Sequence, residues 1–236
     1  MSKTIIVGIE FNSRSKPNNH WQVGLTQSWI EYRMSIFMKY TLQSLKKQTN
    51  QNFTALIHYA EISENIVLQT LNRYEPLPSN IQFVPNYRRS MEIQENISFG
   101  CDDLYLVRLD CDDTYRKSFI QQLHDYTPQP DTCALINQAG YIYDSVNHRI
   151  AAVTTPSPPF YTWIFKRDEY LAGKYYPSPN GHGGVIMNKH EILTTDRKRN
   201  YMIVVHERNT ANQEWLSFAD FESNPKKVNA VLKKFI

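Results

Sequence analysis

The sequence predicts an α/β protein with a mostly parallel central sheet flanked by helices and a more irregular C-terminal half. Over the first 125 residues, short β-branched and aromatic runs alternate with segments of helical period. After residue 130, short strand-like runs and proline-rich loops replace this alternation. Strands and helices that alternate along a chain form parallel sheets with right-handed crossovers. Such sheets bind ligands beyond the carboxyl ends of their strands.

Each element is predicted from its hydrophobic period and its turn residues. In the first half, strands are expected at 4–9, 53–59, 81–84 and 104–109, and helices at 35–45, 66–74, 91–99 and 118–124, with Ser63 as an N-cap. In the second half, strands are expected at 134–136, 141–143, 150–153 and 201–205, and breaker-rich loops at 155–160 and 177–184. No repeat or linker divides the chain, so we expect one domain over 1–236.

Composition and charge exclude several classes of protein. The 236 residues carry 26 basic and 23 acidic side chains, and a net charge of +3 is too weak to indicate nucleic-acid binding. The three cysteines (Cys101, Cys111 and Cys133) lack CxxC spacing, which argues against a disulfide framework and a structural zinc site. The sequence has no secretory signal and no apolar run long enough to span a membrane, so we expect a cytoplasmic protein.

The strongest chemical signal is RLDCDDT at 108–114, directly after a buried-strand pattern. Because side chains alternate along a strand, Asp110 and Asp112 point roughly the same way. Carboxylates this close repel one another unless a positive group lies among them. Two hard oxygen ligands suit Mg²⁺ or Mn²⁺, which in turn hold phosphate oxygens. The alternative is a solvated acidic turn that caps the next helix.

Three metal-binding architectures use such a motif. A calcium EF-hand fits least. Its sixth position would be Tyr115 instead of Gly, and its twelfth would be Gln121 instead of Glu. Asp110-x-Asp112-x-Thr114 matches a haloacid-dehalogenase-like phosphatase, in which the first Asp is the nucleophile. That motif normally lies on the opening strand, whereas 109 residues precede it here. The DxD motif of a GT-A glycosyltransferase ends about the fourth strand, which matches its position in this chain.

Three segments together carry a resemblance to one group of proteins. They are RMSIF at 33–37 with TLQSLKKQT at 41–49 and Asn52-Phe53, RLDCDD at 108–113, and VVHERN at 204–209. The chain resembles the rhamnosyltransferase-like group of GT-A glycosyltransferases over about residues 5–210. It departs from the pattern between 155 and 200, where we find no acidic pair to supply the base.

The resemblance implies a GT-A-like fold and a metal-dependent, inverting transfer in glycan or polysaccharide synthesis. The sugar would pass from a UDP-, GDP- or dTDP-linked donor to a hydroxyl of a glycan or other acceptor. Residues 1–125 would bind the nucleotide sugar, and 126–236 would form the acceptor half and the tail. The implied ligands of Mn²⁺ or Mg²⁺ are Asp110, Asp112 and His206. The implied donor contacts are Arg33, Arg88, Arg108, Asp110 and Asp113.

The base that takes the proton of the acceptor hydroxyl is left open between three residues. His182 lies in PNGHGG, where glycines allow close backbone approach, and Glu191 and Asp168 are its rivals. The aromatic residues that follow the proline run have two interpretations, stacking on a sugar face or packing in the core. They are Phe160, Tyr161 and Trp163.

Two alternative functions stay open. One is a haloacid-dehalogenase-like phosphohydrolase that forms a phosphoaspartate at Asp110, and the other is a non-catalytic sugar- or nucleotide-binding module. The basic tail also has two interpretations, a peripheral contact with anionic lipid or polymer and a solvated helix face. Its lysines are Lys226, Lys227, Lys233 and Lys234.

Overall fold

The computed structural model of the chain describes residues 2–85, 87–194, 198–209 and 215–236, without the side chains of 87–90, 215 and 218. The strands are β1 (Lys3–Glu10), β2 (Thr54–Tyr59), β3 (Ile81–Pro85), β4 (Asp103–Asp110), β5 (Thr114–Tyr115), β6 (Ala134–Ile136), β7 (Ala139–Asp144), β8 (Arg149–Thr154), β9 (Tyr161–Lys166), β10 (His190–Ile192) and β11 (Tyr201–Val205). The helices are α1 (Gln27–Lys39), α2 (Thr41–Lys46), α3 (Glu64–Leu71), α4 (Tyr87–Ile97), α5 (Phe119–Asp125), α6 (Arg167–Leu171), α7 (Trp215–Phe218) and α8 (Pro225–Leu232). Short 3₁₀ turns are η1 (Gln22–Leu25), η2 (Glu61–Ser63) and η3 (Gly181–Met187).

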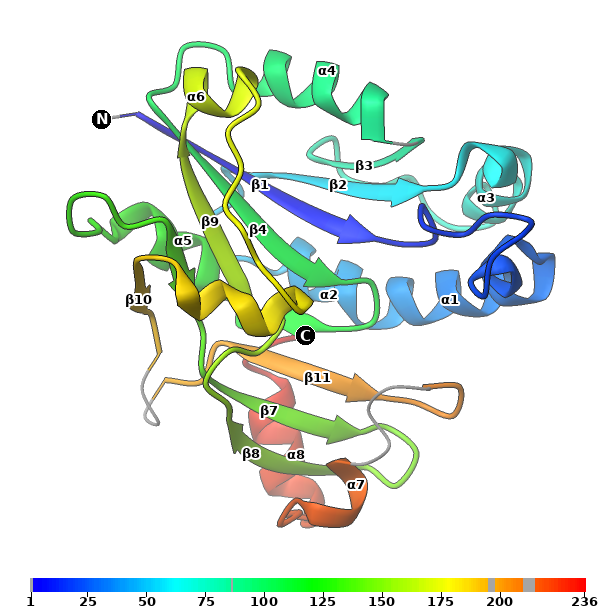
Figure 1. Ribbon diagram of the computed structural model, residues 1–236. Helices are drawn as coiled ribbons and strands as arrows, with labels where there is room; N and C mark the ends of the chain where they lie inside the picture. The colour runs from blue at the N-terminus through cyan, green and yellow to red at the C-terminus, as the bar shows by residue number, and fades with distance from the viewer. Residues whose placement is uncertain (1, 86, 195–197, 210–214) are drawn as a thin grey trace.

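The larger sheet is mostly parallel, as predicted, with the strand order β10-β6-β9-β4-β1-β2-β3 (Figure 1). Strands β3, β2, β1 and β4 run parallel, and β9 runs antiparallel between β4 and β6. The register aligns Glu10 with Asp110 on one side and with His58 on the other. These three residues therefore share one row, at the carboxyl ends of three parallel strands.

Helices cover both faces of this sheet, which explains why its strands read as continuous apolar runs. In Figure 1, α1 and α2 lie on one face, and α4 and α6 lie on the other. Phe37 and Leu42 join the core of the first face, around Val7. On the opposite face, Leu56 and Phe165 pack with residues of α4 and α6. The central strands of the sheet are thus covered by helices on both faces.

The helix predicted at 35–45 differs from the structure at its start and in its middle. Helix α1 begins at Gln27, because Ile30, Met34 and Phe37 continue one buried face at helical spacing. Tyr40 separates α1 from α2, and its ring packs against Tyr143 in a separate hydrophobic core under the second sheet. The adjacent Tyr32 and Arg33 lie within α1, so the position of this helix determines where both side chains point.

The second sheet has the order β5-β11-β7-β8 and follows the acidic motif directly. Strand β5 pairs with β11 through Thr114 and Met202, so the residues after Asp113 are bound into this sheet. Helix α8 and the residues that follow it cover this sheet, with Val228 in the helix and Phe235 after it both fully buried. Strands β5, β9 and β10 were not predicted, because the first and last are only two and three residues long and β9 follows the proline run.

Candidate active site

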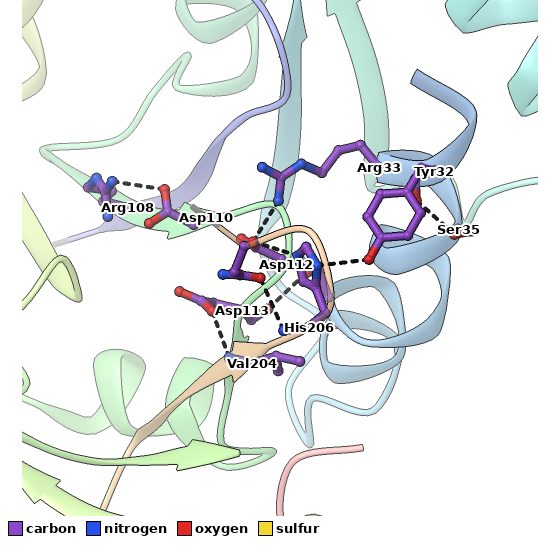
Figure 2. A network of polar contacts seen from close by, with 11 residues as sticks. Tyr32, Arg33, Ser35, Arg108, Asp110, Asp112, Asp113, Val204 and His206 are labelled. Carbon is purple, nitrogen blue, oxygen red and sulfur yellow. Dashed lines mark hydrogen bonds and ion pairs between the residues drawn. The ribbon is translucent and has the colours of Figure 1, made fainter. Parts of the chain in front are cut away.

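The carboxyl end of β4 carries the first pair of charged side chains in the candidate site (Figure 2). Arg108 and Asp110 are two residues apart and therefore share a face of the sheet. Arg108 Nη2 donates to Asp110 Oδ1 at 2.8 Å, and Arg108 Nη1 donates to the carbonyl oxygen of Pro159 at 2.7 Å. The guanidinium thus joins the acidic motif to the proline-rich loop, and about a third of each side chain remains exposed.

Asp112 is the meeting point of α1, the acidic loop and the end of β11. Arg33 Nη1 lies 2.5 Å from Asp112 Oδ2, and His206 Nε2 lies 3.3 Å from the same oxygen. On the far side of the imidazole ring, His206 Nδ1 lies 2.9 Å from the hydroxyl of Tyr32. The guanidinium of Arg33 also packs over the ring of Trp29 at 5.1 Å. Figure 2 shows both α1 side chains pointing toward the acidic loop.

Asp113 faces inward and holds the loop to the second sheet. Its side chain accepts a hydrogen bond from the backbone N–H of Val204 at 3.0 Å, and its carbonyl accepts one from Thr41 Oγ1 at 2.8 Å. Asp113 is only 3% exposed. Asp113, which was predicted to contact the nucleotide sugar, therefore contacts β11 and α2.

Burial and neighbouring charges separate the three carboxyl groups electrostatically. Burial raises the pKa of Asp113 well above its usual value, and the charges of Asp112 and Asp110 add to this shift. Burial also raises the pKa of Asp110, against the opposing charge of Arg108. For Asp112, burial favours the neutral form, but the hydrogen bond from His206 and the charge of Arg33 lower its pKa below the usual value. Asp112 is thus the motif's most stable carboxylate.

The carboxylates of Asp110 and Asp112 have the chemistry that a divalent cation requires. In the contacts of the described residues, Asp110 uses Oδ1 and Asp112 uses Oδ2, and the other oxygen of each accepts no hydrogen bond. Among those residues, no three His, Cys, Asp or Glu side chains gather into a complete metal site. Mg²⁺ commonly takes one or two carboxylates and completes its shell with water and phosphate. Asp110 and Asp112 therefore fit Mg²⁺ or Mn²⁺.

The structure brings one of the three base candidates close to the charged pair. His182 is the second residue of η3 and is exposed, and its carbonyl accepts a hydrogen bond from Ser157 Oγ at 2.6 Å. Its pKa is lowered by partial burial and by the charge of Arg108, against the charge of Asp110. The proline-rich loop links His182 to the end of β4, since Ser157 bonds to His182 and Pro159 accepts a hydrogen bond from Arg108.

The other two base candidates lie elsewhere. Glu191 is in β10 and accepts hydrogen bonds from Tyr126, Thr132 and the backbone of Gln129 at 2.6–2.8 Å, which hold the loop before β6. Asp168 follows β9 beside the start of β4 and is almost fully exposed next to Arg167. At about 3.3 Å per residue, the eight residues of β4 separate Asp168 from the acidic motif by roughly 23 Å.

The aromatic residues that follow the proline run divide between the core and the partly exposed surface. Phe160 is fully buried and stacks on Tyr201, with ring centroids 4.0 Å apart, so it belongs to the core. Tyr161 and Trp163 are partly exposed on β9. The side chain of Arg88, a predicted donor contact in α4, lies outside the described residues. Glu10, which was not predicted, lies beside Asp110 at the end of β1, and its carboxylate accepts hydrogen bonds from Ser13 Oγ.

Comparisons with known proteins assign the chain to a family of glycosyltransferases. A family model described as "Putative rhamnosyl transferase" matches residues 18–172, about two thirds of the chain. The chain belongs to this family, which confirms the predicted resemblance and identifies the protein as a glycosyltransferase. No curated protein sequence matches the chain.

Solved structures resemble the chain only distantly. S. aureus TarS 1–349 shares 12% identity over 98% of this chain and 70% of that chain, with a TM-score of 0.41. The mannosyltransferase PcManGT from Pyrobaculum calidifontis, in complex with GDP-Man and Mn²⁺, shares 8% identity over 89% of this chain and 59% of that chain, with a TM-score of 0.42. 4-Diphosphocytidyl-2C-methyl-D-erythritol synthase from Anaerococcus prevotii shares 17% identity over 98% and 96%, with a TM-score of 0.36.

Proposed function

We propose that this glycosyltransferase moves a hexosyl or deoxyhexosyl group from a nucleoside-diphosphate sugar to an acceptor hydroxyl, with inversion and with a divalent cation, in glycan synthesis. The observation that carries the proposal is the set of two carboxylates and two guanidinium groups at the end of β4, namely Asp110, Asp112, Arg33 and Arg108. No contact of the described residues favours the phosphohydrolase alternative at Asp110.

The charged groups divide the work on the donor. Asp110 and Asp112 would hold the cation, and a bound cation would neutralise the charge that develops on the leaving diphosphate. Arg33 and Arg108 each have one N–H group on a carboxylate, and a guanidinium has five N–H donors. Apart from the Arg108 N–H that bonds to Pro159, the remaining donors suit phosphate oxygens, which Arg binds in a planar fork. The diphosphate would therefore lie between the two arginines.

His182 is the proposed base. A lowered pKa keeps an imidazole neutral near pH 7, and only the neutral ring can accept a proton. The ring would take the proton of the acceptor hydroxyl as that oxygen attacks the anomeric carbon of the donor. Since the base and the leaving diphosphate act on opposite faces of that carbon, the anomeric configuration inverts.

A thermal-shift panel tests the donor and the cation together. UDP, GDP and dTDP are each added with and without MnCl₂, to the wild type and to Asp112→Asn. Ligand at 100 times its Kd stabilises a protein by about 2.7 kcal/mol, and a protein of this size gains about 2–4 °C for each kcal/mol. We expect one of the three nucleotides to raise the Tm of the wild type, and to do so only when MnCl₂ is present. The Tm of Asp112→Asn should not increase with any of them.

The exposed Asp168→Asn is the matched control and should respond like the wild type. A wild-type Tm that stays constant for all three nucleotides with MnCl₂ would rule out the proposed donor site. An equal increase without MnCl₂ would rule out the role of the cation.

We further propose that the predicted contact with anionic lipid uses a lysine cluster made of Lys47, Lys117, Lys233 and Lys234. Lys117 N–H and Nζ donate to the carbonyls of Lys234 and Lys233 at 3.0 and 2.7 Å. The backbone N–H of Thr49, two residues after Lys47, donates to the carbonyl of Lys117 at 2.8 Å. The pKa of Lys117 is lowered by burial and by the charge of Lys47. Lys227 pairs with Glu222 and is therefore not part of this lysine cluster.

Co-sedimentation with vesicles tests this contact. Each lysine near an anionic membrane contributes about 1 kcal/mol, so Lys233→Glu/Lys234→Glu should lower binding to phosphatidylglycerol vesicles about 30-fold or more. Lys226→Glu, at the opposite end of α8, is the matched control. Equal binding to phosphatidylcholine vesicles would contradict the proposal. Among the described residues, no helix has the length and apolar character to cross a bilayer.

A further inference from the structure

Four aromatic rings form a continuous stack beside the candidate site, from α5 to β11. The rings of Phe119 and Tyr115 are stacked with centroids 3.9 Å apart, and those of Phe160 and Tyr201 are stacked at 4.0 Å. Tyr115 and Phe160 meet in a T-shaped contact at 5.7 Å, which joins the two pairs. Each of the four residues is at most 2% exposed. The stack therefore links three segments that are distant in the sequence.

The stack is seated tightly on the second sheet. A Cβ on Gly140 in β7 would lie 2.2 Å from the ring of Tyr201, so any larger residue there would displace this ring. The carbonyl oxygen of Phe160 accepts hydrogen bonds from the backbone N–H and from Nδ2 of Asn137 at 3.0 and 3.2 Å. Asn137 is itself fully buried. Both the ring and the backbone of Phe160 are thus held in place.

The hydroxyl of Tyr115 connects this stack to the backbone of Arg108. It donates a hydrogen bond to the carbonyl oxygen of Arg108 at 2.8 Å. The antiparallel pairing of β4 with β9 ends one residue earlier, at Val107 and Thr162. Tyr115 therefore holds the backbone of β4 just beyond its last pair with β9, where the strand approaches the acidic motif.

The guanidinium of the same arginine is held by the residue that precedes Phe160. Arg108 Nη1 donates to the carbonyl oxygen of Pro159 at 2.7 Å, and Nη2 donates to Asp110. Arg108 is thus fixed at its backbone by Tyr115 and at its guanidinium by the segment that carries Phe160. A side chain ordered before binding loses less conformational freedom when a ligand arrives. About a third of the Arg108 side chain is exposed and accessible to such a ligand.

We propose that Tyr115 is a positioning residue for Arg108, and that the aromatic stack sets the direction in which the guanidinium meets the donor diphosphate. The inference rests on the proposed function in taking Arg108 as a contact of that diphosphate. Tyr115 is too deeply buried to touch a substrate and acts through Arg108. The second sheet, which carries Gly140 and Tyr201, thereby gains a role in donor binding.

Titration calorimetry with UDP, GDP and dTDP in the presence of MnCl₂ tests this role. Tyr115→Phe removes only the hydroxyl and keeps the stacked ring. We expect it to raise the Kd of the bound nucleotide about 10-fold, within the range of coupling inside one hydrogen-bond network. In an Arg108→Ala background the same substitution should have no further effect on Kd, because the hydroxyl acts through that guanidinium.

Tyr201→Phe is the matched control. It also removes one buried hydroxyl from the stack, but this hydroxyl donates to the carbonyl oxygen of Gln138 at 3.3 Å and not to Arg108. Its Kd should equal that of the wild type. Equal losses of affinity in both tyrosine variants would overturn the proposal, as would a Tyr115→Phe loss that persists in the Arg108→Ala background.

The ¹H–¹⁵N signals of the arginine side chains in the nucleotide-free protein supply a second measurement. The signal that Arg108→Ala removes is that of Arg108. We expect separate Nη–H signals for this guanidinium in the wild type and in Tyr201→Phe, and signals averaged by faster rotation in Tyr115→Phe. Unchanged signals in Tyr115→Phe would contradict the proposal. If the wild type binds none of the three nucleotides, the proposed donor fails, while this spectrum still decides whether Tyr115 positions Arg108.

Discussion

His182 is predicted to control the lower pH limit of activity. Burial and the charge of Arg108 lower the pKa of its imidazole below the ordinary value of about 6.5. Because the base works only when neutral, kcat/KM should stay constant as pH falls to about 6.5 and decrease only below it. His182→Ala should lower kcat about 10²–10⁴-fold, with little change in the KM of the donor. Initial rates between about pH 5 and 8 measure both effects.

Glu191→Gln is the matched control for that experiment. The carboxylate of Glu191 holds Tyr126 and Thr132, so the substitution should lower Tm and leave kcat nearly unchanged at a temperature where the protein is folded. If Glu191→Gln removes activity and His182→Ala does not, Glu191 is the base instead.

The loop at 177–187 should tolerate a methyl group at one glycine and not at the next. A Cβ on Gly184 would lie 2.2 Å from the carbonyl oxygen of Pro179, whereas a Cβ on Gly183 would meet nothing within 4 Å. Gly184→Ala must therefore move the backbone that carries His182. Since misplacing a reacting group by about 1 Å can cost about 10²-fold in rate, we expect a decrease in kcat/KM of at least about 10-fold.

Gly183→Ala is a closely matched control, because it differs from the first variant by one position. Its kcat/KM and Tm should equal those of the wild type. Equal losses in both variants would show that chain flexibility matters here, and not the contact between Gly184 and Pro179.

Stability of the molecule should depend on the small core under the second sheet. Phe235 is fully buried beside Tyr141, at 5.9 Å between ring centroids, and packs with Val204 and Val228. Removing a buried Phe side chain costs about 3–5 kcal/mol. At about 2–4 °C for each kcal/mol, Phe235→Ala should lower Tm by roughly 6–20 °C, as measured by circular dichroism. Lys234→Ala, which is exposed, should not.

The same substitution should reduce activity before it unfolds the protein. Strand β11 leads directly into His206, and the backbone of Val204 donates to Asp113. Loosening this strand therefore disturbs the acidic loop. Full activity of Phe235→Ala just below its Tm would contradict this coupling between the second core and the site.

Local patterns were sufficient for the parallel strands and for the acidic motif. The runs at 4–9 and 104–109 are rich in β-branched and aliphatic residues and mostly buried, so their composition predicts a strand without further information. Asp110 and Asp112 follow such a strand at a spacing of two. The start of α1 was missed although Ile30, Met34 and Phe37 have helical spacing, and the aromatic strand β9 was missed because it follows the proline run.

The partners of the motif depend on packing between distant segments. Arg33 is 79 residues from Asp112, and His206 is 94 residues from it. Tyr32 and His206 are 174 residues apart. No local spacing encodes such contacts, because they exist only once α1 lies against the sheet and β11 pairs with β5. Hydrophobic period and residue chemistry therefore predict the fold class and the carboxylates. Long-range packing determines which basic side chains and hydrogen-bond partners surround those carboxylates.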